Sequence, residues 1–146
     1  MKALFLYVFF FGIISLNAQS TIGPVETVKE FFKAFHEQDT AKMHKMTYKS
    51  VIMQSISVDS MGVTQLKNSD YKTFLSSIAA IPKDASFEER ISEYNVQRDE
   101  AMAQVWAPYE FYYQGNLSHS GTNNFQLLKE NGFWKIFYIV DTRLGN

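Results

Sequence analysis

The apolar residues of this chain change their spacing near residue 87, and this change restricts the fold more than any other feature. Between residues 24 and 81, apolar side chains mostly recur every three or four positions, which forms the stripe of amphipathic helices. From Phe87 onward they recur at about every second position, which is typical of strands with one buried face. Helices followed by a block of strands predict an α+β domain.

The N-terminal part predicts three helices and one strand. Pro24 suits the first turn of the first helix, where its missing N–H costs nothing. Asp39 or Thr40 can cap the second helix. Ser69 or Asp70 can cap the third. The expected elements are a helix at about 24–37, a short helix after residue 39, a strand at about 51–58 and a helix at about 69–81.

The C-terminal part predicts an antiparallel meander of four strands. Short connections that contain glycine, Gln114-Gly115 and Glu130-Asn131-Gly132, separate the last three strands and supply the positive φ that tight hairpins need. Consecutive strands joined in this way pair antiparallel. The expected strands cover about residues 88–97, 100–113, 116–129 and 133–143.

Residues 1–18 are expected to be a secretory signal peptide, which leaves 19–146 as a single domain. Lys2 precedes an apolar run that ends at Leu16, and this run is shorter than the ~20 residues that span a bilayer. Ala18 offers a small residue for cleavage. An uncleaved membrane anchor is the alternative, whereas no cysteine follows the run to carry a lipid. We therefore expect an exported protein, periplasmic or secreted, that leaves the membrane after cleavage.

The composition excludes several classes of function. The chain has no cysteine, so an exported domain must rely on its apolar core, and thiolate zinc sites and cysteine nucleophiles are excluded. A formal net charge of −1 does not provide the basic patch of a nucleic-acid-binding domain. No phosphate loop, Gly-x-Ser-x-Gly elbow or metal-ligand spacing is present, so we expect no metal and no resident cofactor. His36 and His44 have charged neighbours and are expected to be solvated.

The C-terminal segment contains a series of short motifs. They are Trp106-Ala107-Pro108-Tyr109, His119-Ser120-Gly121, Phe125-Gln126-Leu127, Trp134-Lys135-Ile136 and Asp141-Thr142-Arg143. With the order of the expected elements, they resemble the nuclear transport factor 2-like superfamily, and in particular its exported bacterial branch named for lumazine binding.

This resemblance implies a cone-shaped fold with a pocket at its open end. The cone is a strongly curved antiparallel sheet, with four long strands and one or two short ones, wrapped around three N-terminal helices. The resemblance also implies that a flavin- or pteridine-like ligand could bind. Proteins with this fold include ketosteroid isomerases, polyketide cyclases, dehydratases and modules for binding or dimerisation, so the fold alone does not decide the function.

One face of the third expected strand changes from polar to apolar along its length. Phe125 and Leu127 are expected to mark the core side. His119 and Asn123 share that face by alternation, nearer the mouth of the cone. Because a buried polar group is costly unless it is hydrogen-bonded, these two side chains either pair with protein groups or are available to a ligand. His119 could act as a general acid or base, with Asn123 orienting it, and Gly121 between them favours a bend.

Aromatic side chains could complete a pocket for a flat ligand. The candidates are Trp106 and Tyr109 on the second expected strand, Phe125 on the third and Trp134 on the fourth. Pro108 has no N–H and needs a sheet edge or a bulge, and a bulge would reverse the alternation. The sequence therefore leaves open which aromatic rings face inward. Packing in the core or in a dimer contact is the alternative role.

The last expected strand has one face that is more apolar than the other. That face consists of Trp134, Ile136, Tyr138, Val140 and Thr142, and it is expected to pack on the helices. Asp141 then points away from the interior of the cone, unless a bulge rotates it. We expect Asp141 and Arg143 to form a cross-strand ion pair at a sheet edge or dimer face, in preference to a catalytic role.

Three functions follow as hypotheses. The first is an exported, non-enzymatic small-molecule-binding protein, homodimeric through the outer face of its sheet. Its ligand contacts would be His119, Asn123, Trp106, Tyr109, Phe125 and Trp134. The second is an enzyme of isomerase, cyclase or dehydratase type with His119 as general base. The third is a structural or dimerisation module without a ligand. We favour the first, because the sequence reveals no carboxylate base.

Overall fold

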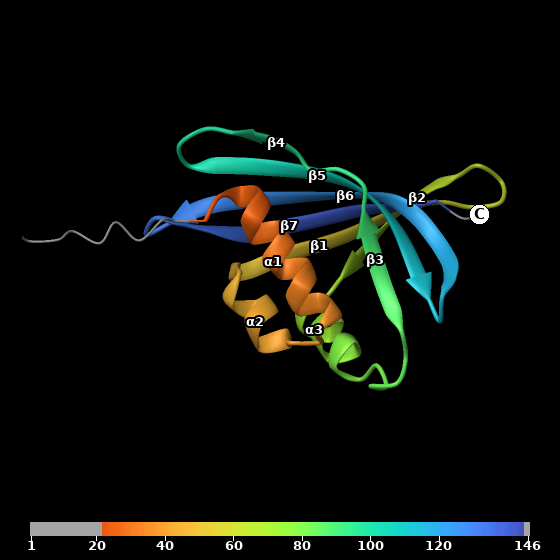
Figure 1. Ribbon diagram of the computed structural model, residues 1–146. Helices are drawn as coiled ribbons and strands as arrows, with labels where there is room; N and C mark the ends of the chain where they lie inside the picture. The colour runs from red at the N-terminus through yellow and green to blue at the C-terminus, as the bar shows by residue number, and fades with distance from the viewer. Residues whose placement is uncertain (1–21, 145–146) are drawn as a thin grey trace, which may run out of the picture.

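The computed structural model describes residues 22–144, in which three helices pack against one curved sheet (Figure 1). The helices are α1 (Pro24–His36), α2 (Thr40–Lys45) and α3 (Tyr71–Ala79). The strands are β1 (Thr47–Val58), β2 (Thr64–Ser69), β3 (Phe87–Ile91), β4 (Asn95–Arg98), β5 (Met102–Tyr113), β6 (Asn116–Glu130) and β7 (Phe133–Arg143). The expected signal peptide lies outside the described residues, and none of the three helices is long and apolar enough to cross a membrane. The α+β prediction is confirmed.

The seven strands form one sheet in the order β2-β1-β7-β6-β5-β3, and β4 also pairs with β5. β5, β6 and β7 are the predicted antiparallel meander. β1 is the exception, because it pairs parallel with β7. The strand expected at 88–97 is divided into β3 and β4, which pair with successive parts of β5. β2 is a further strand that the sequence pattern did not predict.

The apolar face of α1 packs on the concave side of the sheet (Figure 1). Its buried residues include Val28, Phe31, Phe32, Ala34 and Phe35. The rings of Phe31 and Phe32 meet Phe125 of β6 edge-on, with centroids 5.8 and 5.4 Å from it. Asp39 and Asp70 accept backbone N–H groups as the N-caps of α2 and α3, so each short helix begins at a carboxylate.

A bulge in β7 reverses the side-chain alternation that the sequence predicts for this strand. The pairing of β7 with β6 shifts by one residue at Phe137. Before the shift, Trp134 and Ile136 are buried as expected, but after it the buried residues are Ile139 and Asp141. The prediction that Asp141 points away from the cone is therefore wrong, because the bulge rotates it inward.

Gly121 lies where β6 passes very close to β7. A Cβ atom at this position would overlap the carbonyl oxygen of Thr142 and would lie 3.1 Å from Cε1 of Tyr109. The regular ladder between the two strands stops beside Gly121 and resumes as a single bridge between Ser120 and Leu144. The absence of a side chain at Gly121 thus allows a close approach of two backbones.

Candidate functional site

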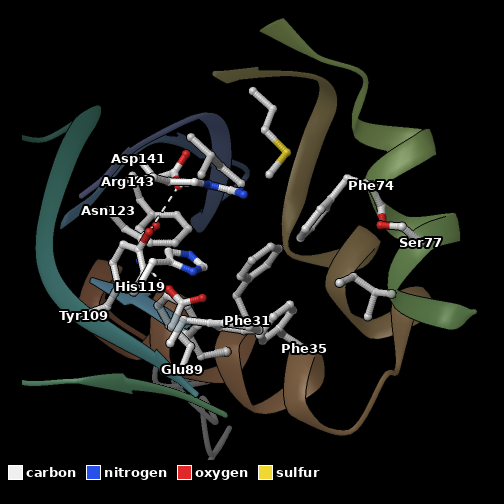
Figure 2. Close-up of a pocket in the computed structure, with 16 residues that line it drawn as sticks. Phe31, Phe35, Phe74, Ser77, Glu89, Tyr109, His119, Asn123, Asp141 and Arg143 are labelled. Carbon is white, nitrogen blue, oxygen red and sulfur yellow. Dashed lines mark hydrogen bonds and ion pairs between the residues drawn. The ribbon is translucent and has the colours of Figure 1, made fainter. Parts of the chain in front are cut away.

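A cavity of about 280 Å³ lies between the helices and the concave face of the sheet. Figure 2 shows Phe31, Phe35 and Phe74 on its helical side, with polar side chains projecting from the sheet opposite them. Ligand pockets in proteins usually have volumes of ~300–1,000 Å³. The cavity is therefore suited to a small ligand.

One row of side chains across the sheet makes part of the cavity apolar. Met53 of β1 pairs with Ile139 of β7, and Ile139 pairs with Phe125 of β6. All three line the cavity, as do the rings of Phe31 and Phe74 from the helices. Burial of apolar ligand surface against these groups would be favourable.

The next row on the same face of the sheet is polar. Ser55 of β1 pairs with Asp141 of β7, which pairs with Asn123 of β6. The Ser55 hydroxyl donates to Asp141, and the Asn123 amide donates to Oε1 of Glu89 on β3 at 2.6 Å. Arg143 Nε donates to Asp141 Oδ2 at 2.9 Å. The predicted ion pair between Asp141 and Arg143 is thus present, but it lies within β7 beside the cavity and not across strands at an edge.

Glu89 is a carboxyl group of the site that the sequence analysis missed. The inward-facing positions of β3 are Phe87, Glu89 and Ile91, so an acidic residue on an otherwise apolar face was the available signal. Burial raises the pKa of Glu89 to about 7, the charge of Asp141 adds to the rise, and the hydrogen bond from Asn123 opposes it. Near neutral pH, Glu89 is therefore present both as an acid and as a carboxylate.

His36 connects β3 to α1. Its Nε2 atom accepts a hydrogen bond from the backbone N–H of Glu89 at 2.9 Å, and its ring lies beside Phe35 and Phe87. Burial lowers the pKa of His36, which favours the unprotonated nitrogen that this bond requires. His36 is exposed, as expected, and its hydrogen bond also fixes the strand that carries Glu89.

His119 lies in the wall of the cavity, on the face that alternation indicates (Figure 2). Its Nδ1 atom is 3.1 Å from Oγ of Ser118, and its ring lies beside Tyr109 and Phe111. Burial lowers the pKa of His119, and the positive charge of Arg143 lowers it further. The imidazole is therefore mainly neutral at pH 7 and can offer a ligand a donor or an acceptor.

Tyr109 connects β5 to the polar row. Its hydroxyl oxygen is 3.0 Å from the carbonyl oxygen of Thr142 and 3.3 Å from Oδ2 of Asp141. Burial raises the pKa of Tyr109, so the phenol keeps its proton and acts as a donor. Together with the bonds from Ser55 and Arg143, this places donors at both oxygens of Asp141.

The structure brings only part of the predicted ligand-contact set into the cavity. His119, Asn123, Tyr109 and Phe125 line it, whereas Trp106 and Trp134 do not. β5 keeps its alternation past Pro108 without a shift, so Trp106 lies on the outer face of the sheet and is 46% exposed. Trp134 is buried at the start of β7, where the ammonium of Lys129 lies 5.7 Å from its ring centroid.

The cavity combines groups that bind with groups that can exchange a proton. Glu89 and His119 both line it, and the pKa of Glu89 lies near neutrality. The negative charge of Asp141 is balanced by the positive charge of Arg143, so Asp141 is suited to positioning the side chains that bond to it. Within residues 22–144, no group of three His, Asp or Glu side chains is arranged to hold a metal ion.

Solved structures similar to this chain include nuclear transport factor 2-like (NTF2-like) proteins. One from Cytophaga hutchinsonii has a TM-score of 0.63 and 13% identity over 82% of this chain and 94% of its own. One of unknown function from Shewanella baltica has a TM-score of 0.56 and 15% identity over 84% and 91%. A candidate dehydratase of the NTF2-like family from Streptomyces avermitilis has a TM-score of 0.61 and 10% identity over 84% and 94%. No family model and no curated protein sequence matches this chain.

Proposed function

We propose that this chain, whose fold is nuclear transport factor 2-like, binds a small molecule with a flat or compact apolar body and one polar end. The observation that carries this proposal is the cavity in which the apolar row through Ile139 lies beside the polar row through Asp141. Apolar burial would supply affinity, and the polar groups would supply orientation. A pteridine ring is one member of this ligand class. We propose that the protein acts after export, and that its outer sheet face, with the exposed Trp106, pairs two copies.

Filling the cavity is expected to weaken binding strongly. Ser77 lies on α3 and lines the cavity, so Ser77→Trp would place an indole across the helical side of the site. We expect this variant to bind 2-naphthamide, a neutral flat probe, at least tenfold more weakly than the wild type, measured by fluorescence titration. Wild-type binding of 2-naphthamide and of lumazine would also appear as an increase in melting temperature.

Ser76→Trp is the matched control for this experiment. Ser76 and Ser77 are both exposed, and each hydroxyl donates to a backbone carbonyl of the preceding turn, but Ser76 is not among the residues that line the cavity. The control is expected to bind 2-naphthamide like the wild type. Equal affinity of both variants, or a wild-type protein that binds neither probe, would contradict the proposed function.

The raised pKa of Glu89 supports a second function, which is acid–base catalysis of the isomerase, cyclase or dehydratase type. A general base is most effective when its pKa is near the working pH, and Glu89 meets this condition better than His119, whose pKa is lowered. Exchange of the α-hydrogens of 2-tetralone for deuterium, followed by NMR, measures proton abstraction next to a carbonyl. We expect the catalysed rate to rise with pH through about 7 and to fall about 100-fold in Glu89→Gln.

Two controls test the assignment of the base. Glu88→Gln removes the neighbouring exposed carboxylate of β3 and is expected to leave the exchange rate unchanged. His119→Asn tests the base that the sequence predicted. If exchange is not catalysed, or is lost in His119→Asn and kept in Glu89→Gln, then Glu89 is not a catalytic base.

A further inference from the structure

A second cavity, of about 360 Å³, lies beside the first between β2 and α3. We call it the mouth cavity, and it is lined by Lys67, Asn68 and Ser69 of β2 and by the start of α3. Four residues line both cavities, namely Met53, Phe74, Ser77 and Arg143. Of these four, Arg143 alone is charged, so a ligand that passes from one cavity to the other passes a guanidinium group.

Arg143 has hydrogen-bonding capacity that the described residues do not use. Its Nε atom donates to Asp141, whereas none of the hydrogen bonds among residues 22–144 involves its two terminal nitrogens. Figure 2 shows the guanidinium group of Arg143 projecting from the sheet toward the cavity. A guanidinium fork of this kind is suited to two parallel bonds to a carboxylate.

Lys67 adds a second cation on the same face of the sheet. It pairs with Ser55 of β1, and Ser55 pairs with Asp141 of β7, so Lys67 continues the polar row to the edge of the sheet. Asp70 is the acidic residue of the mouth cavity, but its carboxylate accepts the N–H and hydroxyl of Thr73 as the cap of α3.

The hydrogen-bond donors and acceptors that the site leaves unused determine which chemical group the polar end of the ligand can carry. Asp141 already accepts from Ser55 and Arg143, and Oε1 of Glu89 accepts from Asn123. Oε2 of Glu89 and Oδ2 of Asp70 remain as acceptors, whereas the unused donors on Arg143 and Lys67 form a positively charged set at the junction of the cavities. Such a set is matched by a ligand group that only accepts hydrogen bonds and carries negative charge.

We propose that the ligand is an apolar acid, with its body in the first cavity and its carboxylate at the junction with the mouth cavity, between Arg143 and Lys67. The apolar body would lie against the row formed by Met53, Ile139 and Phe125. This inference rests on the proposed binding function and narrows its ligand class.

The test compares two probes of the same shape and different charge. 2-Naphthoate and 2-naphthamide differ only in a carboxylate or a carboxamide on the same ring system. At pH 6 and low salt, we expect the wild type to bind the naphthoate at least tenfold more tightly than the naphthamide. Arg143→Met is expected to remove this preference, and Lys67→Met is expected to reduce it about threefold.

Lys72→Met is the matched control for charge. Lys72 is an exposed lysine of α3 that is not among the residues lining either cavity, so the preference should persist in this variant. Melting temperatures would confirm that each variant is folded, and Arg143→Lys shows whether the fork or the charge alone is needed. Equal affinity of the wild type for both probes would overturn the inference and leave the binding function standing, whereas failure to bind either probe would overturn both.

Discussion

Replacing Gly121 with alanine is expected to lower the free energy of unfolding by about 3 kcal/mol, because overpacking against a rigid backbone leaves little room for relaxation. The added Cβ would overlap the carbonyl oxygen of Thr142, which belongs to a strand paired on both sides and cannot turn away as a flexible side chain could. It would also press on the ring of Tyr109 at 3.1 Å. Urea unfolding of the wild type and the variant measures the difference.

Gly23→Ala provides the comparison for this effect. A Cβ at Gly23 would lie 2.7 Å from a carboxylate oxygen of Glu26, which is the mobile end of an exposed side chain. We therefore expect this variant to lose less than about 1 kcal/mol, mainly through the change of N-cap. A loss below about 1 kcal/mol in Gly121→Ala would show that β6 and β7 can separate at this point.

Gly121 also connects the stability of the fold to the geometry of the site. The ring of Tyr109 lies over the glycine, and its hydroxyl lies beside Asp141. Separation of β6 from β7 would therefore move a donor of the polar row as well as the backbone. A folded Gly121→Ala protein should bind the naphthalene probes more weakly, although Gly121 itself provides no side chain to a ligand.

Local signals explain why the C-terminal meander could be predicted from the sequence. The two hairpins have positive φ at Gln114, Gly115, Asn131 and Gly132, and the last three of these are residue types that the turn chemistry favours. The N-caps at Asp39 and Asp70 are equally local. Features of this kind depend on residues close in sequence, so a single sequence is sufficient to predict them.

The parts of the site that were not predicted depend on contacts between distant segments. The bulge at Phe137 has no composition signal of its own, yet it moves Asp141 from the outer face to the cavity. β1 pairs parallel with β7, which brings Ser55 to Asp141 across more than half of the chain. Glu89 could have been noticed as an acidic residue between Phe87 and Ile91, but its partner Asn123 could not have been identified without the sheet order.

Glu89→Gln is expected to remove a large pH dependence of stability. In the unfolded chain this carboxyl group titrates near 4.5, and in the fold its pKa is about 7. At low pH the carboxyl group is protonated in both the folded and the unfolded state, and its contribution to the free energy of unfolding is fully present. As the pH rises from 4.5 toward 7, the unfolded chain ionises first, so the wild type progressively loses stability, and above pH 7 the loss is complete. A pKa shift of this size changes the free energy of unfolding by about 3 kcal/mol.

Urea unfolding at pH 5 and pH 8.5 measures this effect as a difference between variants. Between these two pH values, the wild type is expected to lose about 2–3 kcal/mol more than Glu89→Gln, since glutamine cannot ionise. The titration of His36 and of His119 contributes to both proteins and cancels in the difference. Glu88→Gln, on the same strand, should keep the wild-type dependence, because Glu88 is exposed and its pKa is lowered by the bond from Arg90. Parallel pH profiles of the wild type and Glu89→Gln would mean that Glu89 is solvated and has an ordinary pKa, which would also remove the support for its role as an acid–base group.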